Sequence, residues 1–126
     1  MKTQIVCKGA PAAIGPYSQA VSTDGLLFVS GQMGLDVKTG EIPSGIADQA
    51  KQVFENIKAI IAEAGGSMDD VVKCCVFLKD MNDFAAMNEV YGGYFKEPYP
   101  ARTTVEAARL PKDVKVEIDA IAVIKK

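Results

Sequence analysis

The residue best suited to chemistry is Arg102, in the stretch Tyr99-Pro100-Ala101-Arg102-Thr103-Thr104. Pro100 stiffens the backbone just before the arginine, which opens a predicted strand. A guanidinium offers a planar fork of donors that fits carboxylate or phosphate. We predict that Arg102 anchors an anion in a small-molecule site. The residues alone leave open a surface or interface ion pair with one of the sixteen acids.

Glu117 is the second candidate, because it lies in the middle of a strand predicted over 114–124. Its own face of that strand also carries Ile121 and Val123, which indicates partial burial. A partly buried carboxylate can orient or deprotonate a water molecule. The alternative is a solvated carboxylate on the outer face of a sheet.

Tyr17, Ser30, Gly31 and Asn88 are further candidates. Tyr17 follows a rigid Gly-Pro pair, and its phenol could bond a ligand or cap the edge of the core. Gly31 after a hydrophobic strand permits a bulge or a close backbone approach. Asn88 falls on a predicted helix, where it could also be a satisfied structural amide.

The residue inventory narrows the possible chemistry. The chain has no histidine, which excludes Ser-His-Asp and Cys-His catalysis and histidine metal sites. Cys7, Cys74 and Cys75 form no CxxC motif or disulfide framework, and packing is their predicted role. Together with the lack of a signal-like N-terminus or a long apolar run, this predicts a reducing, cytoplasmic location and no membrane.

Length and composition predict one globular domain over residues 1–126. Hydrophobic residues make up 48% and charged residues 24% of the chain, which is ordinary for a packed protein. The net charge of −2 and the lack of a basic cluster before Lys125-Lys126 argue against a nucleic-acid partner.

The pattern of apolar residues and turns predicts a β-β-β-α-β-α-β-β order. Strands are predicted at 3–7, 17–22, 26–37, 71–78, 102–107 and 114–124, and helices at 46–64 and from Asn82 toward Pro98. Two helices can cover one face of such a sheet. Because 26–30 and 71–78 are apolar on both faces, the other face requires a partner, most simply another copy of the chain.

Several segments together resemble one family. They are Gly15-Pro16-Tyr17-Ser18-Gln19-Ala20, Phe28-Val29-Ser30-Gly31-Gln32, Gln52-Val53-Phe54-Glu55-Asn56, Pro100-Ala101-Arg102-Thr103-Thr104-Val105, and Leu110-Pro111 with Val116-Glu117-Ile118-Asp119-Ala120. In this order they resemble the RidA family (YjgF/YER057c/UK114) over essentially the whole chain.

The resemblance implies an α+β, chorismate-mutase-like fold, with a mixed sheet of about six strands and two helices on one face. It implies a homotrimer with inward-facing sheets and ligand clefts between subunits. The implied activity is that of a 2-iminobutanoate/2-iminopropanoate deaminase, which hydrolyses imino acids from PLP-dependent dehydratases to 2-oxo acids and ammonia. A protonated imine is already electrophilic, so no cofactor or metal is expected.

The resemblance also assigns roles to residues. Arg102 would bind the substrate carboxylate and Glu117 would handle the water, while Tyr17, Ser30, Gly31 and Asn88 line or support the cleft. Archetypal members often have a cysteine where this chain has Thr104, whose side chain shares strand parity with Arg102. That departure bears on substrate preference.

Two other functions stay open at this stage. The same cleft could serve a regulatory module that senses small carboxylates, because a fold does not fix a function. Some family members have been described as ribonucleases or translation inhibitors, although acidity and the missing histidine argue against an RNA-directed activity here.

Overall fold

The computed structural model describes residues 1–124; Lys125 and Lys126 lie outside the described residues. Its order confirms the predicted sequence of strands and helices. The elements are β1 (Thr3–Ile5), β2 (Ala20–Thr23), β3 (Leu26–Gln32), α1 (Ile46–Glu63), β4 (Val71–Leu78), α2 (Phe84–Tyr94), β5 (Ala101–Glu106) and β6 (Val116–Val123). Short 3₁₀ turns precede β4, α2 and β6.

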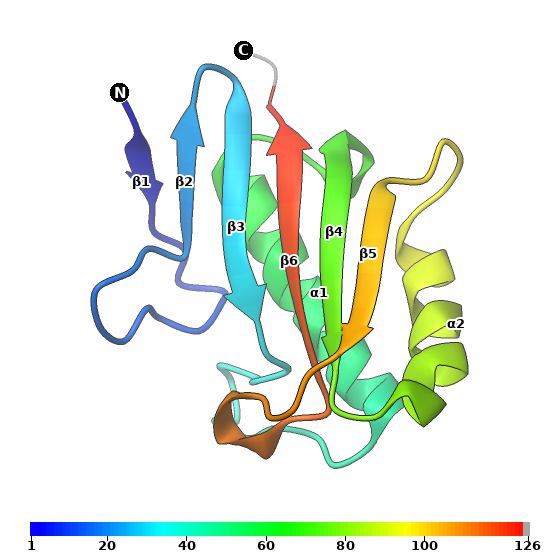
Figure 1. The fold of residues 1–126 in the computed structure, drawn as a ribbon. Helices are drawn as coiled ribbons and strands as arrows, with labels where there is room; N and C mark the ends of the chain where they lie inside the picture. Colours follow the sequence, from blue (N-terminus) through cyan, green and yellow to red (C-terminus); the bar gives the residue numbers. More distant parts are fainter. Residues whose placement is uncertain (125–126) are drawn as a thin grey trace.

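The six strands form one mixed sheet in the order β1-β2-β3-β6-β4-β5 (Figure 1). Only β4 and β5 run parallel, and every other neighbouring pair is antiparallel. Helix α2 is the crossover that parallel neighbours need. The crossover places β5, which carries Arg102, at one edge of the sheet beside α2 (Figure 1).

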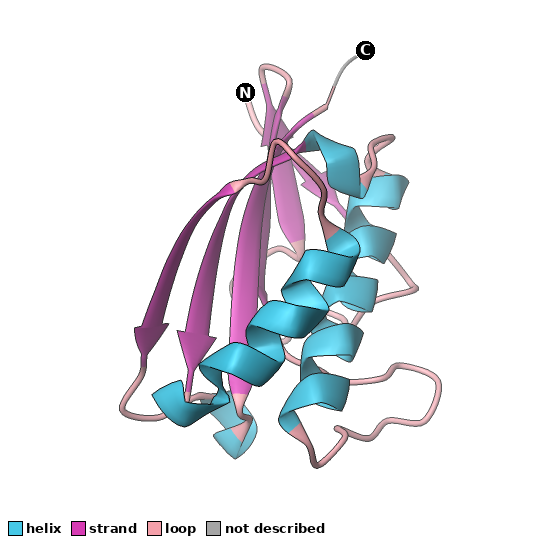
Figure 2. Cartoon of the chain, turned by 90° about the vertical axis from the view of Figure 1, so that its right-hand side faces the viewer, coloured by secondary structure: helices cyan, strands magenta, loops and turns pink. Residues whose placement is uncertain are grey.

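Both helices lie on the same face of the sheet, as predicted (Figure 2). In α1, Val53, Phe54, Ile57, Ile60 and Ile61 recur at helical spacing and are almost fully buried. Alternate residues of β6 complete this core: Val116, Ile118, Ala120 and Ala122 are buried. The intervening β6 residues therefore point to the face that the helices do not cover.

The uncovered face exposes several large apolar side chains, which confirms the prediction that this chain alone leaves apolar sheet surface without a cover. Leu26, Phe28, Val105 and Val123 are 37–42% exposed. Their register runs across the sheet, with Phe28 opposite Ile121 and Leu26 opposite Val123. Apolar patches of this kind mark interaction surfaces.

Four predicted strand boundaries were wrong by two residues or more. The strand predicted over 3–7 ends at Ile5, and the strand predicted over 114–124 begins at Val116. β3 ends at Gln32 instead of continuing to Val37, because the chain turns toward α1: a Cβ at Gly34 would meet the Gln49 backbone at 2.7 Å. β2 begins at Ala20 instead of Tyr17. The side-chain amide of the preceding Gln19 bonds to the 7–11 loop. The Gln19 carbonyl still accepts a hydrogen bond from the Ser30 amide, so the pairing with β3 ends at this residue.

Within residues 1–124, no helix is both long enough and apolar enough to span a membrane.

Candidate functional site

Arg102 is held by three side chains of α2. Its Nη1 donates a 2.7 Å hydrogen bond to Asn88 Oδ1. Its guanidinium carbon lies 4.6 Å from the centroid of the Tyr91 ring and 5.4 Å from that of Phe84. Both distances are within the range of cation–π attraction. The guanidinium is therefore fixed in place without an acidic partner.

The sequence of α2 explains this arrangement. Phe84, Asn88 and Tyr91 are spaced four and three residues apart, so they share one stripe of the helix. The stripe faces β5, where Arg102 projects toward the helices. Next to it is a hollow of about 480 Å³ lined by Asn88, Tyr91, Gly92, Tyr99, Pro100 and Arg102.

The contact of Phe84 and Tyr91 with Arg102 was not among the sequence-based predictions. The available signal was the pair of aromatic residues flanking Asn88 at helical spacing. The Asn88 oxygen accepts a hydrogen bond from Arg102, as a structural amide would, and contact of Asn88 with a ligand stays a prediction.

Thr104 lies on the same face of β5 as Arg102, as its parity predicts. Its hydroxyl oxygen is buried and has no hydrogen-bond partner within residues 1–124. Cys74 is opposite Arg102 in the β4–β5 register. Burial raises the pKa of the Cys74 thiol to about 12, so this cysteine is inert and packs in the core as predicted.

Glu117 lies on the uncovered face of the sheet, where it is half-buried as predicted. Its carboxylate lies against the backbone of Gly31, so closely that a Cβ added to Gly31 would collide with it. The β3–β6 register shifts between Val29 and Gln32, which confirms the bulge predicted at Gly31. Glycine at this position lets the bulged backbone and the Glu117 carboxylate lie together without displacing the carboxylate.

Burial raises the pKa of the Glu117 carboxyl above its ordinary value, and the negative charge of Asp119 adds to this effect. Asp119 is on the same face of β6 and accepts a bond from the Cys75 amide at 3.1 Å. A carboxyl with a raised pKa is a better base for water than an ordinary glutamate.

Tyr17 and Ser30 lie beside a second hollow on the uncovered face, of about 750 Å³, whose lining also includes Lys73, Cys75 and Asp119. The Ser30 hydroxyl donates to the Ser18 carbonyl at 2.6 Å, so it fixes the loop that carries Tyr17. Tyr17 itself is 53% exposed and free to meet a ligand or another subunit.

Gln19 organises the same loop, and no signal in the sequence singled this residue out. Its side chain is 4% exposed. It accepts a bond from the Cys7 amide at 2.7 Å and donates to the carbonyls of Cys7 and Pro11. A buried amide with these bonds substitutes for the strand pairing that the loop lacks.

The predicted site residues therefore form two groups on opposite faces of the sheet. Arg102, Asn88 and Thr104 lie on the helix side, at the β5 edge. Tyr17, Ser30, Gly31 and Glu117 belong to the uncovered side. Glu117 is opposite Phe77, which is opposite the exposed Val105, so its face is not that of Arg102. One chain does not bring Arg102 and Glu117 together.

Metal binding has no obvious donor set in the described part of the chain: residues 1–124 contain no group of three or more cysteine and carboxylate side chains placed to hold an ion.

The sequence profile of the family described as Endoribonuclease L-PSP matches residues 7–124. The chain belongs to this family. The L-PSP family includes the RidA proteins, so the resemblance on the Gly15–Ala20 and Pro100–Val105 motifs is confirmed.

Individual L-PSP relatives match over nearly their whole lengths. A RutC family protein of Pyrococcus horikoshii is 59% identical over 123 residues, covering 97% of this chain and 98% of the relative. The 2-iminobutanoate/2-iminopropanoate deaminase of Escherichia coli K12 is 51% identical over 126 residues, covering 98% of each. The crystal structure of E. coli TdcF with bound serine superposes with a TM-score of 0.93 at 50% identity, covering 98% of this chain and 99% of TdcF.

Proposed function

We propose that this chain is a deaminase that hydrolyses 2-iminobutanoate and 2-iminopropanoate, the products of PLP-dependent dehydratases, to 2-oxo acids and ammonia. The observation that carries the proposal is the Arg102 guanidinium, held by Asn88 and Tyr91 beside an open hollow. The full-length match to an E. coli enzyme of that name supports it. So does TdcF, whose bound serine is, like the proposed substrate, a small acid with nitrogen on its second carbon.

The chemistry follows from the two groups of residues. Arg102 binds the substrate carboxylate and fixes the adjacent imine carbon. Glu117 takes a proton from water as the water oxygen bonds to that carbon, and the C=N electron pair moves to nitrogen. Glu117 then returns its proton to the amino nitrogen of the carbinolamine, and the C–N bond breaks to release ammonia. The hydroxyl gives its proton to the Glu117 carboxylate as it becomes the carbonyl of the 2-oxo acid. A protonated imine is electrophilic enough for this addition without further activation.

The assembly that we propose is a homotrimer of chorismate-mutase-like subunits with their sheets facing inward. The apolar uncovered face supports it, since burying this face requires other copies. The separation of Arg102 from Glu117 within one chain supports it as well. A cleft between subunits would combine the Arg102 group of one copy with the Tyr17, Gly31 and Glu117 group of its neighbour.

The remaining expectations extend this proposal. Thr104 replaces a cysteine of archetypal members and would tune substrate preference through its buried hydroxyl. The location in the cytoplasm, beside dehydratases, stays a prediction, as does the absence of nucleic-acid and membrane partners.

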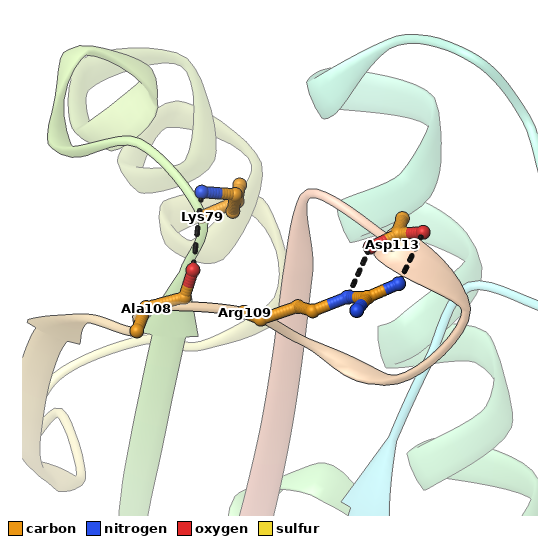
Figure 3. A network of polar contacts seen from close by, with 4 residues as sticks. All are labelled: Lys79, Ala108, Arg109 and Asp113. Atoms are coloured by element: carbon orange, nitrogen blue, oxygen red, sulfur yellow. Dashed lines mark hydrogen bonds and ion pairs between the residues drawn. The ribbon is translucent and has the colours of Figure 1, made fainter.

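The decisive experiment couples a PLP-dependent threonine dehydratase to this protein and follows imine decay. Arg102→Ala should abolish the acceleration. The matched control is Arg109→Ala, at the only other arginine of the chain. Arg109 pairs with Asp113 at 2.8 Å in an exposed loop (Figure 3). If Arg102→Ala protein and wild type release ammonia equally fast, the site assignment is wrong.

The same samples separate the alternatives. Wild-type protein that binds 2-oxobutanoate but leaves the imine untouched would indicate a carboxylate sensor. RNA cleavage that Arg102→Ala abolishes and Arg109→Ala leaves intact would assign the site to RNA.

A further inference from the structure

Tyr91 belongs to two environments at once. Its side chain is 5% exposed and packs against Phe95, at 4.7 Å between ring centroids, and edge-on against Phe54, at 5.7 Å. These contacts are those of an ordinary core aromatic. The Arg102 guanidinium at 4.6 Å from its centroid is different, because it places a cation over the ring at the rim of the hollow.

The neighbours of Arg102 hold the cation without neutralising it. Within residues 1–124, Arg102 forms no ion pair; its partners are one amide and two aromatic rings. A carboxylate in their place would hold the guanidinium more tightly but would compete with an anionic ligand. Of the five N–H donors of the guanidinium, Asn88 occupies one, so the others can receive an anion.

The Tyr91 hydroxyl does not perform this function. Its oxygen is buried beside the Cys74 thiol and forms no hydrogen bond with Arg102. Burial raises the pKa of Tyr91 above its ordinary value, so the side chain is neutral at physiological pH. What Tyr91 offers to Arg102 is the negative face of its ring.

We propose that Tyr91 is a positioning residue, whose ring holds the Arg102 guanidinium in a fixed orientation at the hollow. The identity of the anion rests on the proposed function. The placement of the guanidinium does not depend on that function, because it is observed in the contacts of Arg102 with Tyr91, Phe84 and Asn88.

This role predicts a specific kinetic signature. A carboxylate contact is made equally in the ground state and the transition state, so losing its preorganisation weakens binding more than it slows chemistry. KM for the imine and Kd for the product 2-oxobutanoate should rise together, while kcat changes less.

The experiment changes the negative charge on the face of the aromatic ring at position 91 while an aromatic ring of similar size is kept. Tyr91→Phe removes only the hydroxyl and should bind 2-oxobutanoate close to wild type in titration calorimetry. Replacing Tyr91 by a trifluorinated phenylalanine keeps the ring but withdraws charge from its face, and should weaken binding severalfold. Tyr91→Leu should weaken it by about tenfold, equivalent to about 1.4 kcal/mol.

The matched control is Tyr94→Leu, which removes a ring of the same helix that stacks on Phe54 at 4.9 Å but does not contact Arg102. This variant should lose thermal stability and keep its affinity. If the trifluorinated ring binds as tightly as the phenylalanine ring, or if Tyr94→Leu loses as much affinity as Tyr91→Leu, Tyr91 is only a core residue.

A spectroscopic measurement distinguishes this failure from that of the proposed function. The ring current of Tyr91 should shift the Arg102 Nε–H signal upfield in the free protein. The shift should persist in Tyr91→Phe and become clearly smaller in Tyr91→Leu, where only the more distant Phe84 ring remains near the guanidinium. This result needs no substrate. If the Arg102 Nε–H signal is shifted upfield in a protein that binds no 2-oxobutanoate, the proposed function is wrong but the positioning of Arg102 by Tyr91 stands. If the signal is not shifted, the positioning role of Tyr91 is wrong.

Discussion

Asn88 is the polar contact that decides how Arg102 is presented. Because a guanidinium only donates, the Asn88 oxygen must face Arg102, as it does at 2.7 Å. This orientation leaves the two amide hydrogens of Asn88 available to a ligand in the adjoining hollow. Asn88 therefore orients the anion receptor without adding negative charge.

Asn88→Asp should keep this geometry and impair binding. The new carboxylate would form an ion pair with Arg102 and repel the substrate carboxylate, so we expect Kd for 2-oxobutanoate to rise at least about tenfold, since hydrogen bonds to charged groups contribute about 1.5–3 kcal/mol. Calorimetric titration measures it, and thermal unfolding of the same variant should show no loss of stability. Unchanged affinity would mean that the ligand does not meet Arg102.

Glu117 should impose an acid limb on the pH profile. It acts as a base only when ionised, and its pKa is raised by burial and by Asp119. The fall of kcat/KM toward low pH should therefore be centred above the ordinary glutamate value of about 4.3. Asp119→Asn removes the neighbouring charge and should move this limb to lower pH. If Asp119→Asn did not move the acid limb of the kcat/KM profile, the group that titrates there would not be Glu117.

Glu117→Gln should separate activity from stability. Loss of the base should lower kcat by about 10²–10⁴-fold. The pKa of Glu117 is higher in the folded protein than in the unfolded chain, so protonation of Glu117 stabilises the fold. This stabilisation is complete below the unfolded-state pKa and is lost as pH rises through the folded-state pKa. A neutral glutamine avoids that loss, so the variant should be at least as stable as wild type near pH 7 in thermal unfolding and only equally stable in acid.

At the scale of elements, the bulge in β3 and the stripe of α2 each place one half of the site. The bulge brings the Gly31 backbone against Glu117, and α2 brings Asn88 and Tyr91 against Arg102. Each half is thus built by a single contact between two elements. Either half can be disturbed without the other.

Gly31→Ala tests the half built by the bulge. Its Cβ would collide with the Glu117 carboxylate and displace it, so kcat should fall while binding of 2-oxobutanoate through Arg102 is largely kept. Gly93→Ala in α2 is the control, because nothing lies within 4 Å of the added Cβ. It should stabilise the helix by about 0.5–1 kcal/mol without loss of activity. If the Gly31→Ala variant kept the full kcat, Glu117 would not be needed for catalysis.

At the scale of the whole molecule, the proposed site would require more than one chain. Arg102 and Glu117 occupy opposite faces of one sheet, and the face that carries Glu117 is uncovered and exposes several apolar side chains. In a closed assembly, each cleft would take the two halves from different copies.

Mixing two inactive variants tests this arrangement. Arg102→Ala and Glu117→Gln subunits, unfolded together and refolded at equal amounts, should recover about a quarter of wild-type activity, because that fraction of clefts pairs two intact halves at random. Each variant refolded alone is the control. No recovery in mixed oligomers, verified by mass spectrometry, would place both residues in one subunit.

Much of the fold could be predicted from the sequence, because periodicity is a local property. The helical spacing of Val53, Phe54, Ile57 and Ile60 fixed α1, and the alternation in β6 separated Val116 and Ile118 from Glu117. Boundaries failed where tertiary contacts replaced strand pairing, at Gln19 and Gly34. The candidate residues came from their chemistry and from family motifs.

By itself the sequence determined the composition of the site: an anion receptor in Arg102, a carboxylate in Glu117, a glycine able to bulge, and a sheet with too much apolar surface for two helices. Only the tertiary structure decided how these residues are grouped. The alternation along one strand shows which of its residues share a face. Which residues of different strands lie on the same face depends on the register between the strands, which shifts at Val29–Gln32 and at Val71–Lys73. That register, and the side on which α1 and α2 pack, separated Arg102 from Glu117 and gave Arg102 its Tyr91 ring.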